Sequence, residues 1–161
     1  MSPARSPVPR APHAIRTAGL ALTAVSAVVL VLGTVVTGSG PHSGDTKAAR
    51  TGFDPETVSQ LHADAVFVMV GLTLALWLGL RALGAPLRVT RAAAVLLLLE
   101  LAQGVIGFVQ YFTGLPVLLV LAHMLGSCLV WVATINVLLA VAAPQDGQAS
   151  TDRDHSLAST A

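Results

Sequence analysis

The sequence predicts an all-α integral membrane protein, a bundle of four transmembrane helices in up-down-up-down order. Three observations support this fold class. The chain is strongly apolar, with 54% hydrophobic and only 11% charged residues, whereas soluble domains carry about 25% charged residues. Four long apolar runs follow one another along its 161 residues. Connections that contain Gly, Pro and charged residues separate these runs and allow the chain to reverse direction.

Each apolar run is long enough to cross a bilayer once. The runs cover residues 18–36, 61–83, 92–112 and 116–142. A helix rises about 1.5 Å per residue, so about 20 residues span a hydrocarbon core about 30 Å thick. The first run, with its basic flank, could instead be a signal peptide. Its 19 apolar residues are long for a signal core, however, and no A-x-A site follows.

The predicted bundle occupies residues 18–142, and polar segments flank it on both sides. Residues 1–17 are basic and Pro-rich, and residues 143–161 form a polar tail after the last run. Both segments are expected to be disordered, because they contain too little apolar surface to bury. Three connections join the runs: the Gly-rich stretch 37–59, the basic connector 81–91 and the tight link Thr113-Gly114-Leu115.

The basic residues predict the orientation of the bundle. Cytoplasmic segments of membrane proteins are enriched in Lys and Arg. With the N-terminus inside, seven of the nine basic residues are cytoplasmic: Arg5, Arg10, Arg16, Arg81, Arg88, Arg91 and Arg153. The remaining two, Lys47 and Arg50, lie in the long loop. The sequence therefore predicts a multi-pass protein of the cell membrane with both termini in the cytoplasm and the lipid bilayer as its surroundings.

Composition excludes several classes of function. The net charge of +1 provides no broad basic surface, so nucleic acid is not expected as a partner. The single cysteine, Cys128, lies within an apolar run. It permits neither an intrachain disulfide nor a zinc site built from cysteine pairs.

Two of the five histidines lie within predicted membrane helices. Asp54 and Pro55 are typical of a helix start, and Pro116 marks another. His62 follows Pro55 by seven residues, and His123 follows Pro116 by seven residues. Both helices begin on the same side, so the two imidazoles are expected at one depth in the outer half of the membrane.

A histidine pair at one depth can bind a heme. The second and fourth helices of such a bundle are diagonal partners, and bundles place cofactors between facing helices. Two neutral imidazoles, those of His62 and His123, can then supply both axial ligands of a heme iron. Zinc or copper would need three or four ligands. Asp64, the nearest further donor, points about 200° away around the helix.

Other readings of the histidines remain open. His62 and His123 could each simply form a hydrogen bond across helices. His13 and His155 lie in the polar tails, where solvated bystanders are expected, and His42 in the outer loop is ambiguous.

Small and polar residues line the predicted inner faces of three helices at helical spacing. Such residues let helices, or a flat ring, approach closely, although ordinary helix packing explains the first stripe equally well. The stripes are Gly19, Thr23, Ser26, Leu30, Gly33 and Thr37 on the first helix; Glu100, Gln103, Gly104, Gly107 and Gln110 on the third; and His123, Gly126, Ser127, Val130 and Thr134 on the fourth.

Glu100 and Arg50 are further candidate site residues. An acid deep in a membrane helix is expensive and is a functional candidate by default. Glu100 could relay protons, act in catalysis or bond neighbouring helices as a neutral group. Arg50, with Lys47, could pair with heme propionates, although both could equally be ordinary loop charges.

Four segments together resemble the heme A synthase family: TGSGPHSGD, LHADAVF, QGVIGFVQYFTGLP and LAHMLGSCLVW. The resemblance covers about residues 29–140 and implies a place in heme A biosynthesis, the oxidation of heme O to heme A for terminal oxidase assembly. The family resembles two fused four-helix halves, and this chain is similar to one half, more closely the C-terminal one. That half holds a heme b, and His62 and His123 match its iron ligands.

The chain departs from the family at two points. The substrate half of the family carries a glutamate three residues before its first histidine, where this chain has Ser59. The paired loop cysteines of many members are also missing. The resemblance therefore implies a half-size or truncated oxidoreductase that pairs with itself or with a second four-helix half. The alternatives are a heme b electron-transfer or carrier subunit without enzymatic activity, and a bundle without a cofactor.

Overall fold

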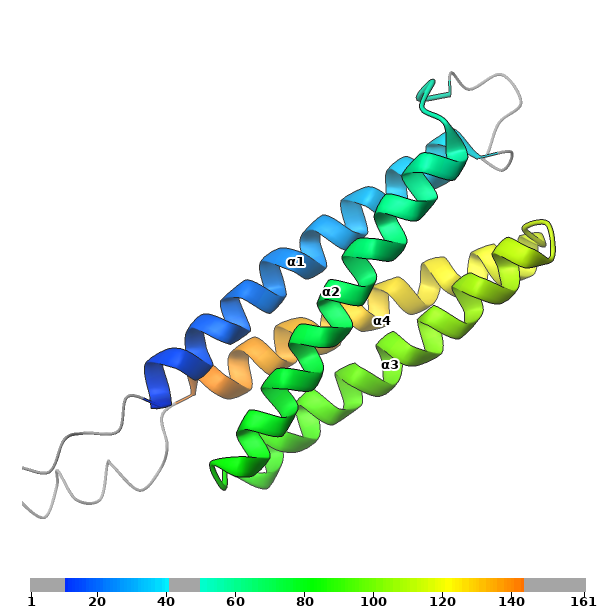
Figure 1. Ribbon diagram of the computed structural model, residues 1–161. Helices are drawn as coiled ribbons and strands as arrows, with labels where there is room; N and C mark the ends of the chain where they lie inside the picture. The colour runs from blue at the N-terminus through cyan, green and yellow to red at the C-terminus, as the bar shows by residue number, and fades with distance from the viewer. Residues whose placement is uncertain (1–10, 41–49, 144–161) are drawn as a thin grey trace, which may run out of the picture.

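Four helices make up nearly all of residues 11–40 and 50–143, which are the residues that the computed structural model describes. They are α1 (Ala11–Ser39), α2 (Pro55–Ala82), α3 (Leu87–Phe112) and α4 (Val117–Ala142) (Figure 1). All four are long and apolar enough to cross a membrane. The predicted all-α fold with four membrane helices is confirmed.

The helices extend beyond the apolar runs, and this corrects one expectation. Residues 1–17 were expected to be disordered, but α1 begins at Ala11. Adding residues to an existing helix is easier than starting one, so a helix formed in the apolar run propagates into its flanks. Pro12 is tolerated because the N–H groups of the first turn have no intrahelical acceptor. Residues 1–10 and 144–161 lie outside the described part of the chain.

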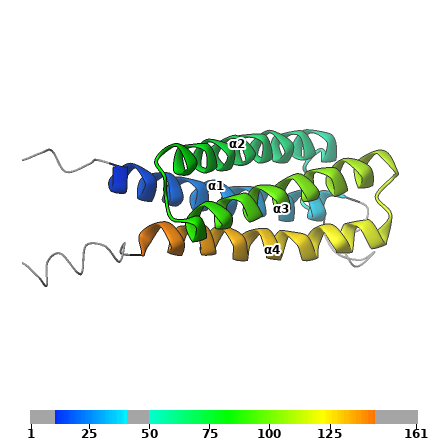
Figure 2. The same cartoon turned by 90° about the horizontal axis from the view of Figure 1, so that it is seen from below.

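The helices form a bundle in which neighbours in sequence are neighbours in space. α1 packs against α2 and α4, and α3 packs against the same two helices. Within the described helices, neither diagonal pair, α1–α3 or α2–α4, is in contact. Figure 2 shows the start of α1, the end of α4 and the α2–α3 link at one end of the bundle. We call this the terminal end, and the opposite end, where α2 and α4 begin, the histidine end.

The two short links use the same local chemistry. α2 and α3 each end at a glycine in the left-handed region, Gly84 at φ 63° and Gly114 at φ 77°, where the missing Cβ avoids a steric penalty. At the second link the N–H of Leu115 donates to the carbonyl of Gln110 over 2.8 Å, which satisfies an end carbonyl of α3. Pro116 follows as the N-cap of α4, so the chain reverses within four residues.

The predicted start of α2 is confirmed. Asp54 is the N-cap, and Pro55 occupies the first helical position. The Asp54 carboxylate accepts hydrogen bonds from the hydroxyl of Thr57 at 2.7 Å and from its N–H at 2.8 Å. Both bonds favour the ionised form and lower the pKa of Asp54 below its ordinary value of 3.8, the hydroxyl bond having the larger effect.

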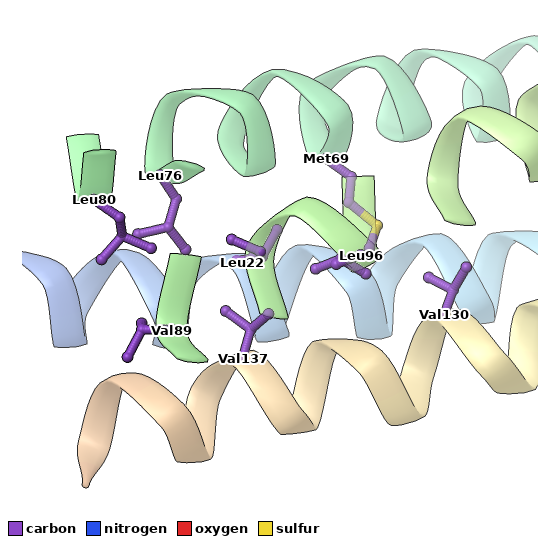
Figure 3. Close-up of a cluster of buried hydrophobic side chains, with 9 residues drawn as sticks. Leu22, Met69, Leu76, Leu80, Val89, Leu96, Val130 and Val137 are labelled. Atoms are coloured by element: carbon purple, nitrogen blue, oxygen red, sulfur yellow. The ribbon is translucent and has the colours of Figure 1, made fainter. Parts of the chain in front are cut away.

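The apolar core fills only the terminal half of the bundle. Met69 on α2 and Val130 on α4 are the core residues nearest the histidine end. Figure 3 shows this cluster between the helices. Its members are Leu22, Met69, Leu76, Leu80, Val89, Ala93, Leu96, Val130 and Val137. Among the described residues, no hydrophobic side chain of the histidine half is fully buried.

The outer surface of the bundle is apolar along its length. Large side chains such as Leu98 (67% exposed), Val105 (64%) and Leu118 (80%) face outwards. Continuous exposed apolar surface of this kind marks a membrane-facing surface. The protein is therefore a multi-pass membrane protein with lipid around its helices.

Candidate functional site

His62 lies on α2, where its imidazole packs over a glycine of α1. A Cβ built on Gly33 would lie only 3.3 Å from Cε1 of His62, so the missing side chain creates the space for the ring. The backbone carbonyl of Val29 lies near this imidazole. The ring nitrogen Nδ1 is buried without a hydrogen-bond partner that meets strict geometry.

His123 on α4 repeats this arrangement against α3. A Cβ on Gly107 would lie 3.4 Å from Cε1 of His123. Here the backbone carbonyl of Gln103 lies near the ring, and Nδ1 is again buried without a strict partner. In both hairpins the carbonyl belongs to the residue four before the glycine. Each histidine therefore lies in a cradle formed by one glycine and one carbonyl of the neighbouring helix.

The two imidazoles enter the bundle from diagonal helices at nearly the same level. His62 is the eighth residue of α2 and His123 the seventh of α4, a difference of about 1.5 Å along a helix. Both rings are partly buried, and they are close enough to interact electrostatically. The structure brings together the two histidines that the sequence singled out, within the half of the bundle that lacks an apolar core.

Two glutamines add polar groups to the inner wall of this half. The side-chain oxygens of Gln103 and Gln110 are buried without hydrogen-bond partners. The amide of Gln103 lies directly against Gly126 of α4, where a Cβ would clash with it. Gln103 and Gln110 flank Gly107 on the inner face of α3, as the predicted stripe required.

A layer of buried polar residues crosses the middle of the bundle, and only Met69 and Val130 of the apolar core lie on its histidine side. Each helix contributes one buried residue: Ser26, Thr73, Glu100 and Thr134. The hydroxyl of Thr73 donates to Oε1 of Glu100 over 2.7 Å. The hydroxyls of Ser26 and Thr134 lie 3.4 Å apart. Oε2 of Glu100 is buried without a partner.

The other candidate residues lie away from the histidine pair or outside the described residues. Asp64 is exposed and accepts a hydrogen bond from Gln60 over 2.8 Å, in agreement with its predicted direction. Both line an open surface pocket of about 500 Å³ on the first turns of α2, outside the bundle. Arg50 and His13 are exposed. The described residues leave out His42, Lys47 and His155.

The donor set fits an iron that already has four equatorial ligands. Two imidazoles lie at nearly the same level on diagonal helices. No group of three or more His, Cys, Asp or Glu side chains occurs in the described ranges, whereas zinc needs three or four. A ligating histidine commonly donates its other ring N–H to a backbone carbonyl. With Nδ1 in that role, Nε2 of His62 and His123 would be free to coordinate. A heme iron, with four porphyrin nitrogens, requires only these two ligands.

Sequence reasoning missed the pairing of each histidine with its cradle. Gly33 and Gly107 were recognised as parts of small-residue stripes, and the histidines as a pair. Which glycine meets which histidine depends on how the helices pack.

Comparisons of the chain with protein-family models, with curated protein sequences and with solved structures find no match.

Proposed function

We propose that this chain is a membrane heme protein of the heme A synthase type, with His62 and His123 as the axial ligands of a heme b iron. The observation that carries the proposal is the repeated cradle, in which each imidazole lies over a glycine and near a backbone carbonyl of the neighbouring helix. Two such cradles lie on opposite helix pairs, so one ring nitrogen of each histidine would be available to a shared iron.

A purely structural role for the histidines accounts less well for the same contacts. A histidine that only links two helices is expected to complete its hydrogen bonds, because an unpaired buried polar group costs about 1–3 kcal/mol. Here Nδ1 of both histidines and the oxygens of two nearby glutamines are buried without partners. Four incomplete polar groups in the half without an apolar core favour a site built for a ligand.

Different parts of the bundle would contribute to heme binding in different ways. Nε2 of His62 and His123 would bind the iron, and Gly33 and Gly107 would allow the rings to lie flat against the neighbouring helices. The apolar core would exclude water from the terminal half. Arg50, exposed at the histidine end, would pair with a propionate. When bound, the heme would supply one-electron transfer.

The proposed activity is the oxidation of heme O to heme A, performed by this chain together with a second bundle. Ser59 is partly buried on α2, at the position where the resemblance places a glutamate in the substrate half. A hydroxyl cannot act as a carboxylate, so we assign this chain the cofactor half of the reaction. The substrate half would come from another copy or another four-helix protein in the cell membrane.

The activity is tested with heme O and a reductant under aerobic conditions. We expect a monodisperse monomer to bind heme b without producing heme A, because one histidine pair provides one heme site. Heme A should form only when a second bundle with its own histidine pair and acid is added, as extraction and chromatography of the hemes would show. Heme A made by a verified monomer would refute this division and would make Glu100 the next residue to mutate.

A second candidate function is electron transfer or heme transport without oxidation of the heme. Ser59 favours this second function, because electron transfer or heme transport requires no carboxylate near His62. Stable heme b binding with no heme A in any tested assembly would select this function.

A further inference from the structure

Glu100 occupies the middle of the bundle with half of its hydrogen-bonding capacity unused. Its side chain is only 4% exposed. Oε1 accepts a hydrogen bond from Thr73, whereas Oε2 is buried without a partner. A charged group at such a position is costly, and acids inside membrane bundles commonly serve proton or ion transfer.

The histidines are the only other titratable groups facing this interior from the described helices. His62 does so from α2 and His123 from α4, while α1 contributes none among its described side chains. The other charged side chains of α2, α3 and α4 are exposed: Glu56, Asp64, Arg81, Arg88 and Arg91. Glu100 therefore has no buried cationic partner in the described residues that would fix it as a permanent carboxylate.

The surroundings of Glu100 differ on its two sides. Towards the terminal end the apolar core begins one turn away with Leu96, and on the histidine side only Met69 and Val130 belong to this core. Towards the histidine end the same face of α3 also carries Gln103 and Gln110, whose side-chain oxygens lack partners. Because such amide groups can hydrogen-bond water, we expect protons to reach Glu100 from the histidine end.

We propose that Glu100 takes up the proton that accompanies reduction of the bound heme, an inference that rests on the heme site proposed above. Reduction of the heme would raise the affinity of Oε2 for a proton, so Glu100 would take up part of a proton from water at the histidine end. The electron would come from a one-electron donor, dithionite in the laboratory or a semiquinone in the membrane. The proton taken up would partly balance the negative charge of the added electron.

The electrostatic coupling between reduction of the heme and protonation of Glu100 is large enough to measure. Gly107, which contacts His123, follows Glu100 by seven residues, or about 10 Å along the helix. At this separation and an effective dielectric constant of about 20, one added charge changes a neighbouring equilibrium by on the order of tenfold. For a one-electron couple, tenfold corresponds to about 59 mV.

The test is a potentiometric titration of the full heme-loaded chain at a series of pH values. The midpoint potential of the wild type should fall with rising pH by on the order of 59 mV in total. Glu100→Gln, which cannot take up a proton, should lose this fall while keeping the heme spectrum. The control Glu56→Gln, which removes an exposed acid, should keep it. An unchanged pH dependence in Glu100→Gln would overturn the inference.

A second measurement covers the case in which Glu100→Gln does not fold. Reduction of the wild type should produce the infrared carbonyl band of a protonated carboxylic acid, shifted in heavy water. A heme-loaded wild type without this band would contradict the inference while leaving the heme site standing. A chain that binds no heme would instead overturn the proposed function, and the inference with it.

Discussion

Gly33 and Gly107 determine whether the imidazoles of His62 and His123 can lie where they do. In both cases a built Cβ comes within 3.4 Å of the ring, so a branched side chain at either position would have to displace the histidine. The short distance between helix and ring is therefore a property of the glycines as much as of the histidines.

We predict that Gly33→Val and Gly107→Val each weaken heme binding by about tenfold or more. Overpacking costs about 1–3 kcal/mol, and about 1.4 kcal/mol corresponds to tenfold in affinity. The measurement is heme titration of the purified variants, with circular dichroism to check the helices. Gly71→Val is the matched control, because this helical glycine has nothing within 4 Å of its built Cβ. Equal heme affinity in all three variants would show that Gly33 and Gly107 do not position the histidines for heme binding.

For single residues, the sequence could predict the helix face on which a side chain lies. It could not predict which residue of a neighbouring helix that side chain contacts. The stripe containing Glu100, Gln103 and Gln110 faces inwards as its spacing predicted. The hydrogen bond between Glu100 and Thr73 was not predicted, because it depends on the rotation of α2 against α3. Helical periodicity gives the face of one helix, whereas a contact also requires the register of its neighbour.

The helix starts show how local sequence signals work within a long apolar segment. Asp54 caps α2 through Thr57, as the pattern of an acid before a proline predicted. α3 begins at Leu87, before its apolar run, and its N-cap Pro86 makes no side-chain hydrogen bond. Without a stop signal, a helix extends until its flanking residues no longer favour it, so hydropathy alone placed this start too late.

The Asp54 cap makes the stability of α2 depend on pH. Because its folded pKa lies below 3.8, the ionised cap stabilises the fold above that pH, and this contribution is lost as the pH falls through the lowered pKa. Asp54→Ala should therefore lower the thermal unfolding midpoint at neutral pH and by less in acid.

Asp64→Ala is the control for the cap, since it removes an exposed carboxylate of α2 that caps no helix end. Thermal unfolding of both variants in detergent at neutral and acidic pH makes the comparison. A loss of stability in Asp54→Ala that is the same at every pH would contradict a role for the ionised cap.

The whole molecule divides into an apolar terminal half and a polar histidine half. The sequence predicted the four spans and the diagonal histidines, because run lengths and short links determine both. The confinement of the apolar core to one half was not predicted, since it depends on how closely the helix pairs approach. In Figure 1 the α1–α2 pair separates from the α3–α4 pair towards the histidine end.

The excess of basic residues predicts that the terminal end faces the cytoplasm. Single cysteines introduced at Ser43 and Ser156, with Cys128 replaced by serine, should react differently with an impermeant thiol reagent in intact cells. We expect labelling at position 43 and none at position 156. Labelling at 156 alone would reverse the orientation and would place the heme site in the cytoplasmic half of the membrane.

The visible spectrum of the purified protein tests whether one heme iron is bound between the diagonal helices α2 and α4. The wild type should show a low-spin b-type spectrum, because two imidazoles complete the iron's coordination. His62→Ala and His123→Ala should each abolish or strongly weaken it, whereas His13→Ala, at an exposed position, should leave it unchanged. A wild-type spectrum in both helix variants would contradict the account.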